Sequence, residues 1–113
     1  MKLHLAFGGA VIAALLSSSA MAAELRVASG TSIQAVIDQA QAGDTILVEP
    51  GEYKQSIYID KPGITLKGLG DGDNRPMLNG EKKRNDGIIA SGHSVVISGF
   101  HVKGYKGNGI MTQ

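Results

Sequence analysis

Hydrophobic residues follow two different spacings along this chain, one typical of a helix and the other of short strands. The helical spacing comes first, where four hydrophobic residues lie one, three or four positions apart and so share one helix face: Ile33, Val36, Ile37 and Ala40. Thr31 and Gln34 have the spacing of a capping box, and Gly43 suits the left-handed position after a helix. We therefore predict one amphipathic helix over Ser32–Gln41, with Thr31 as its N-cap.

After Gly43 the hydrophobic residues fall into short runs, each bounded by Gly, Pro, Asn or Asp. Such runs are typical of short strands separated by turns. The predicted strands are Thr45–Val48, Ser56–Ile59, Ile64–Lys67, Met77–Leu78, Gly87–Ala90, Val95–Ile97, Phe100–Val102 and Gly109–Met111. Strands this short are not stable alone, so each needs neighbours above and below it.

The runs repeat along the chain. A shift of 31 residues superimposes Ile46 on Met77, Ile57 on Ile88, Ile64 on Val95, Leu66 on Ile97 and Gly68 on Gly99. A shift of 22 residues superimposes Gly87-Ile88 on Gly109-Ile110, and the nine extra residues of the longer repeat fall in two polar loops, Leu69–Arg75 and Asn79–Asp86. The sequence therefore predicts a mainly β fold, a β-solenoid of two to three coils whose equivalent strands stack about 4.8 Å apart in parallel sheets.

The first residues have the features of an export signal. Lys2 precedes an uncharged hydrophobic stretch, Leu5–Leu16, and small residues follow, with the A-x-A pattern at Ala20-Met21-Ala22. We predict a signal peptide over residues 1–22, cleaved after Ala22, and a periplasmic or secreted protein. No later segment is long and apolar enough for a membrane span.

Composition adds three exclusions. With no Cys, the chain has neither a disulfide framework nor a thiolate metal site. A formal charge of +1, which falls to zero when Lys2 is removed, argues against a nucleic-acid partner. Few aromatic residues and 16 Gly favour a turn-rich β chain over a helical bundle.

Two stretches resemble the start of right-handed parallel β-helix proteins of the pectin-lyase-like superfamily: Ser32–Asp38 continuing through Gly43–Tyr53, and Ile57–Gly68. The superfamily includes pectate lyases, polygalacturonases, alginate epimerases and lyases, and the accessory protein of nitrous oxide reductase. The resemblance implies that the helix is a lid on the first coil. It also implies that catalytic residues and calcium ligands of full-length relatives lie on middle coils, so we expect residues 24–113 to be the N-terminal part of a longer β-helix domain.

One group of residues suggests ligand binding. Lys82, Lys83 and Arg84 form a basic run in the second polar loop, and Lys103 and Lys106 are expected on the same side one coil later. Such a patch suits the carboxylates of a uronic-acid polymer. The alternative is an ordinary solvated loop.

The other polar residues have structural explanations beside the functional ones. Asp71–Asn74 offers clustered oxygen ligands for calcium but equally fits a turn. His93 and His101 could transfer protons but fit a surface turn and an outward strand position. Tyr53 and Tyr58 could stack on sugars, although Tyr53 is expected to pack in its turn. Asp44 is expected to be a turn residue. Asp86 and Asn108 are expected to be equivalent turn residues that stack in successive coils.

Two hypotheses for the function remain open. The first is an exported β-helix protein that binds or processes an acidic polysaccharide, with lyase, hydrolase or epimerase activity in a full-length form. The second is a non-catalytic periplasmic or surface scaffold, adhesive or concerned with metalloenzyme maturation. No catalytic residue, cofactor or metal ligand is assigned from the sequence, and whether the protein is an enzyme stays undecided.

Overall fold

The computed structural model describes residues 21–113 of the protein, so most of the predicted signal peptide lies outside the described residues. The described chain contains ten strands and one helix. They are β1 (Glu24–Val27), α2 (Ile33–Gln39), β2 (Thr45–Val48), β3 (Gly51–Tyr53), β4 (Ile57–Ile59), β5 (Thr65–Gly68), β6 (Pro76–Asn79), β7 (Ile88–Ala90), β8 (Val96–Ser98), β9 (His101–Lys103) and β10 (Ile110–Thr112).

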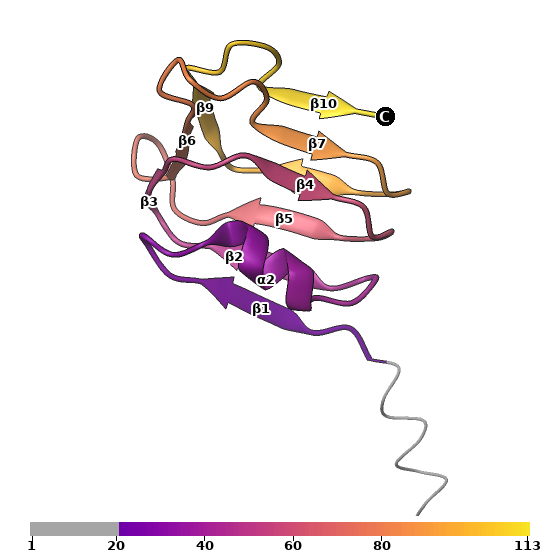
Figure 1. Ribbon diagram of the computed structural model, residues 1–113. Coiled ribbons are helices and arrows are strands. Elements are labelled where there is room, and N and C mark those ends of the chain that lie inside the picture. Colours follow the sequence, from indigo (N-terminus) through magenta and orange to yellow (C-terminus); the bar gives the residue numbers. More distant parts are fainter. Residues whose placement is uncertain (1–20) are drawn as a thin grey trace, which may run out of the picture.

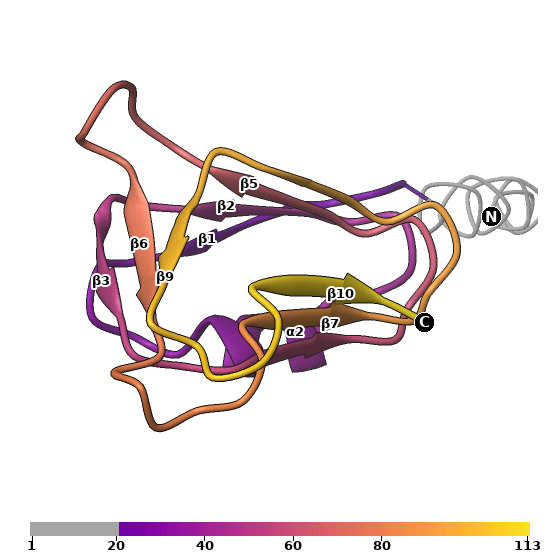
Figure 2. The same ribbon diagram turned by 90° about the horizontal axis from the view of Figure 1, so that it is seen from above.

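The strands form three sheets, and every pair of neighbouring strands is parallel. Sheet A has the order β1-β2-β5-β8, sheet B has β3-β6-β9, and sheet C has β4-β7-β10. From β2 onward the chain visits A, B and C in order, so each of these turns adds one strand to every sheet, whereas the first turn consists of β1 and helix α2 (Figure 1). Seen along the stack, sheets A and C form the two long sides of the coil and sheet B closes one end (Figure 2). The predicted β-solenoid is confirmed.

Hydrophobic columns inside the coil hold the turns together. Ile46, Leu66 and Ile97 are register partners in sheet A, and Ile57, Ile88 and Ile110 are partners in sheet C, as the repeat predicts. Tyr53 and Leu78 pair in sheet B and are almost fully buried. Burial of these columns supplies most of the stabilisation, at about 25 cal/mol for each Å² of apolar surface removed from water.

The length of a turn varies, and the variation lies in the two predicted loops. Strand partners are 20 residues apart between β2 and β5 but 31 apart between β5 and β8. The superposition of Ile46 on Met77 is therefore wrong, because Ile46 pairs with Leu66 in sheet A whereas Met77 pairs with Glu52 in sheet B. The 31-residue shift holds only for strand pairs that have both loops between them.

Two strands, β1 and β3, were not predicted from the sequence. β1 adds a fourth strand to sheet A, so the solenoid has about four turns and not two to three. β1 has only four residues, beside the predicted signal peptide. β3 begins at Gly51, although a Pro-Gly pair such as Pro50-Gly51 is typical of a turn. The strand places Tyr53 inside the coil, where the Tyr53 hydroxyl donates a 2.6 Å hydrogen bond to the Glu49 carbonyl. Tyr53 therefore packs as expected, from a strand rather than a turn.

Helix α2 takes the place of a strand at the lower edge of sheet C, directly beneath β4 (Figures 1 and 2). Ile33 and Ile37 point into the core. The Gln34 side chain imitates a neighbouring strand, because its amide oxygen accepts from the Tyr58 N–H at 2.8 Å and its amide nitrogen donates to the Tyr58 carbonyl at 3.1 Å. The helix thus covers an edge that would otherwise be free to pair with another chain, which agrees with the expected lid.

The helix ends differ from the prediction. Ser32, not Thr31, is the N-cap, and its hydroxyl accepts from the Ala35 N–H at 3.1 Å. The Thr31 hydroxyl instead donates to the Ala28 carbonyl, and Gln34 bonds β4 rather than the cap. At the other end the helix stops at Gln39, two residues before the predicted end, where a side chain from the next turn binds its last carbonyls (below).

Gly68 and Gly99 stack directly, as the repeat predicts. A Cβ atom on Gly68 would lie 2.2 Å from the Gly99 carbonyl oxygen, so the chain can pass from sheet A to sheet B here only if residue 68 has no side chain.

Among residues 21–113, no helix has the length and hydrophobicity needed to cross a membrane.

Candidate functional site

The loop Gly80–Gly87, between β6 and β7, and the loop Gly104–Gly109, between β9 and β10, lie one on top of the other at the corner between sheets B and C. The Lys82 N–H donates to the Gly104 carbonyl at 2.7 Å, and the Lys106 N–H donates to the Arg84 carbonyl at 2.9 Å. This ladder brings together the basic residues of two successive turns, Lys82, Lys83, Arg84, Lys103 and Lys106.

The first loop leaves β6 by a left-handed bend. Glu81 and Lys82 have φ angles of 55° and 59°, which few residues with a side chain adopt. The Asn79 side chain supports the bend, because its amide oxygen accepts from the Glu81 N–H at 2.9 Å while its amide nitrogen donates to Glu52 at 2.7 Å. The bend turns the side chains of Glu81 and Lys82 toward the same surface as Lys103, the register partner of Asn79.

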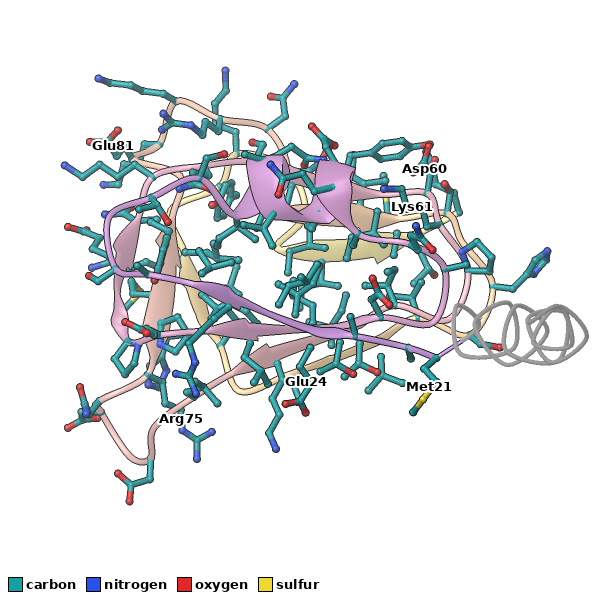
Figure 3. The ribbon with its side chains drawn as sticks, turned by 90° about the horizontal axis from the view of Figure 1, so that it is seen from below. Met21, Glu24, Asp60, Lys61, Arg75 and Glu81 are labelled. Atoms are coloured by element: carbon teal, nitrogen blue, oxygen red, sulfur yellow. The ribbon has the colours of Figure 1, made fainter. Side chains whose placement is uncertain are left out.

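These residues enclose an open depression of about 350 Å³. We name it the basic groove, and its lining is Asn79, Glu81, Lys82, Lys103 and Gly104. Its volume lies at the lower end of the range of small-ligand sites, roughly 300–1,000 Å³. Figure 3, which looks along the stack from below, shows Glu81 among side chains that end in nitrogen, on the opposite side of the coil from Met21.

Charges in and around the groove are unevenly paired. Glu81 accepts from Arg84 at 3.1 Å and lies 3.5 Å from the Lys54 ammonium. In the described part of the chain, the ammonium groups of Lys82 and Lys103 make no salt bridge, and both residues are exposed. The groove therefore presents two free cations beside one neutralised carboxylate.

The pKa of Glu81 is lowered, mainly by the Arg84 hydrogen bond, with the nearby ammonium groups of Lys54 and Lys83 adding to the effect. Glu81 is therefore a carboxylate at neutral pH and has no proton to give. An acid catalyst working near neutral pH needs a raised carboxyl pKa. The groove as built suits recognition of an anion by lysine ammonium groups and the Asn79 amide, rather than acid catalysis by Glu81.

The predicted site residues divide into two groups. Lys82 and Lys103 line the groove. Arg84 is outside the lining and forms a salt bridge with Glu81, which is part of it. Lys83 and Lys106 are exposed and also lie outside the lining. Sequence reasoning missed Asn79 and Glu81. A stacking offset of 24 residues, which places Asn79 on Lys103, would have indicated Asn79, whereas Glu81 reaches the groove through the left-handed bend.

The histidines lie where a structural role would put them. His93 is exposed and its carbonyl accepts from the Gly63 N–H. His101 faces outward from β9, and its Nε2 lies 3.1 Å from the Gly72 carbonyl oxygen. His101 therefore ties the loop between β5 and β6 to the turn above it.

Asp71–Asn74 forms an exposed turn closed by a 2.9 Å hydrogen bond from the Asn74 N–H to the Asp71 carbonyl. Within residues 21–113, no three His, Asp or Glu side chains are grouped as metal ligands.

The remaining turn residues bond between or within coils. Asp86 accepts from the Asn108 N–H at 2.8 Å, so these stacked turns are linked as predicted. Tyr58 is 46% exposed and its hydroxyl lies 3.0 Å from the Ser91 hydroxyl. Tyr105, which the sequence did not single out, donates from its hydroxyl to the Gln55 carbonyl.

Fold and groove together define the class of this protein as a parallel β-solenoid with a helix at its N-terminal end and a basic loop surface at one corner. Comparisons with protein-family models, curated proteins and solved structures found no match.

Proposed function

We propose that the protein is an exported binding module of the right-handed parallel β-helix, pectin-lyase-like type, which holds an acidic polysaccharide in the basic groove. Three features support the type: three parallel sheets per turn, stacked hydrophobic columns, and a helix on the first turn. The signal-peptide pattern of residues 1–22 supports export.

One observation carries the choice of ligand. Lys82 and Lys103, from successive turns, line one open depression and have no carboxylate partner among the described residues. Two unpaired lysines on successive turns suit a ligand that carries carboxylates at regular intervals, such as a uronate polymer. The Asn79 amide and the Gly104 backbone add neutral polar groups for sugar hydroxyls.

Binding is favoured over catalysis because the groove's one carboxyl group, Glu81, has no proton to donate and is already paired with Arg84 and Lys54. In the second hypothesis, a scaffold, the same groove would serve adhesion. Processing of the polymer, if it occurs, would require catalytic groups other than those of this groove.

The test is calorimetric titration of the full chain with polygalacturonate and with alginate, with neutral dextran as the ligand control. The double variant Lys82→Gln/Lys103→Gln should weaken uronate binding at least about tenfold, since hydrogen bonds to charged groups are worth about 1.5–3 kcal/mol each. Lys67→Gln is the matched control, because Lys67 is an exposed lysine on the outer face of β5. It should bind like the wild type.

Added salt should weaken binding, because exposed charges are screened. Equal affinity of all three proteins, or equal binding of dextran, would disprove the groove as the site. Release of ultraviolet-absorbing products from either polymer would show a lyase and remove the binding-only interpretation.

A further inference from the structure

The N–H of Ala23 is held by the buried side chain of Asp44. The Asp44 Oδ1 accepts from Ala23 at 2.9 Å, and its Oδ2 accepts from the Gln41 N–H at 2.8 Å. Asp44 is only 6% exposed and is the one buried charged side chain of the described core. The Ala23 carbonyl also accepts from the Thr45 N–H, so Ala23 is fixed from both sides before β1 begins.

Ala23 is also the residue that signal-peptide cleavage after Ala22 would make the first of the chain. Hydrolysis of the Ala22–Ala23 bond consumes one water, leaves a carboxylate on Ala22, and converts the Ala23 amide into an α-amino group. Below its pKa, ordinarily about 7.7–8.0, that group carries a full positive charge.

We propose that the Ala22–Ala23 bond is a processing site and that Asp44 is the receptor for the amino terminus created there. The new α-ammonium group then occupies the position of the Ala23 N–H, against the Asp44 carboxylate. In the precursor a neutral N–H donates to the Asp44 carboxylate, and in the processed protein that hydrogen bond becomes an ion pair between two charged groups. This inference rests on the predicted export signal and is independent of the polysaccharide proposal.

The surroundings of Asp44 suit a cation there. Its carboxylate accepts two backbone N–H groups, and the charged side chain whose field reaches it is Lys61, from the turn between β4 and β5. The Lys61 ammonium is engaged by the Ile37, Asp38 and Ala40 carbonyls at the end of α2 and does not bond Asp44. Asp44 therefore keeps a negative charge that has no direct ionic partner among the described residues before processing.

The pairing predicts opposite shifts in the two groups. The Asp44 pKa is already lowered, first by the hydrogen bond from Ala23 and then by that from Gln41. The α-amino pKa should be raised above its ordinary value by the carboxylate. A raised folded pKa gives stabilisation that is complete below the unfolded value near 8 and is lost as pH rises through the folded value.

The experiment begins with the full chain, labelled with ¹³C-alanine and exported by bacterial cells that have signal peptidase. Intact mass should show a product that begins at Ala23. The Ala23 methyl ¹³C shift, followed against pH, should give an α-amino pKa at least one unit higher in the folded protein than in the same protein unfolded in urea. The urea comparison needs no variant.

Asp44→Asn is the first control, and its α-amino group should titrate near the ordinary value. Should that variant not fold, N-terminal acetylation of the processed wild type serves instead. Acetylation keeps an N–H donor but removes the charge, so the loss of thermal stability between pH 8 and 10 should disappear. A product beginning at any other residue, or equal folded and unfolded α-amino pKa values, would overturn the proposal, and neither result bears on polysaccharide binding.

Discussion

At the N-terminal end of the coil, Asp44 and Lys61 make long-range hydrogen bonds whose partners could not be predicted from the sequence. Asp44 was predicted as a turn residue, and its turn bond to Gln41 exists, but its bond to Ala23 depends on β1, which was not predicted. Lys61 was not singled out, because the carbonyls that it binds come from a helix more than 20 residues earlier. Long-range polar contacts of this kind carry no local sequence signal.

Replacing Lys61 should test how firmly α2 is fastened. Its ammonium donates to the carbonyls of Ile37, Asp38 and, most closely, Ala40. Lys61→Met keeps the stem and removes the donors, so we expect a loss of about 1–2 kcal/mol, combining charged hydrogen bonds with the helix-dipole interaction. Lys67→Met, on the exposed face of β5, should change the free energy of unfolding in urea by less than about 0.5 kcal/mol. Equal effects would contradict the capping role.

The stacked glycines offer a second test at this scale. Gly68→Ala would drive a Cβ into the Gly99 carbonyl, so it should cost about 2 kcal/mol or more. Gly72→Ala is the matched control, because Gly72 has a φ of 54° but open space around it. Its cost should be only the strain of a left-handed residue, about 1 kcal/mol. Urea unfolding of both variants measures the difference, and a cheaper Gly68→Ala would mean that the two turns do not touch.

Among the elements, the helix shows why patterns locate structure better than they locate its ends. Its apolar face was correct, but the N-cap moved to Ser32 because Gln34 is used by β4 and not by the cap. β3 escaped prediction for a related reason, since Gly51 looks like a terminator and becomes a strand residue only when stacked beneath Pro76. Tertiary contacts decided both outcomes.

Hydrogen exchange should show that α2 protects the edge of β4 as a neighbouring strand would. In Gln34→Met the Tyr58 N–H loses its acceptor, so its exchange should accelerate at least about tenfold, the effect of about 1.4 kcal/mol. The Ile57 N–H, which bonds the Gly87 carbonyl of the next turn, is the internal control and should keep its protection. Equal acceleration of both amides would indicate general unfolding instead of an uncovered edge.

The loop Gly80–Gly87 allows a prediction that links charge to pH. Glu81→Gln frees Arg84 and Lys54, so uronate should bind a few-fold more tightly at pH 7. The folded pKa of Glu81 is lowered, so its ion pairs hold above its unfolded pKa near 4.3 and are lost as pH falls through the lower folded value. Calorimetry should therefore find the advantage of the variant shrinking as the wild-type Glu81 protonates. An advantage that stays unchanged after wild-type Glu81 has protonated, as followed by its side-chain ¹³C shift, would argue against these pairs.

At the scale of the whole molecule, repetition made the fold predictable. The columns through Ile57 and Leu66 follow from the 31- and 22-residue shifts, and so do the two loops that lengthen the turns. The shorter 20-residue turn between Thr45 and Thr65 was hidden, because the longer shift matched more positions. The repeat also predicted that Lys103 lies on the same side as Lys82, one turn later. The positions of Asn79 and Glu81 in the groove became clear only from the register of sheet B and the left-handed bend that follows β6.

The central claim is that stacked loops of successive turns bind a uronate in the basic groove. Its most direct test is a ¹⁵N NMR titration of the folded protein with a short oligogalacturonate. We predict that the largest amide shifts fall on Lys82, Lys103 and Gly104, while Lys67, on the outer face of sheet A, stays unmoved. Shifts centred on any other surface, or none at saturating ligand, would contradict the account.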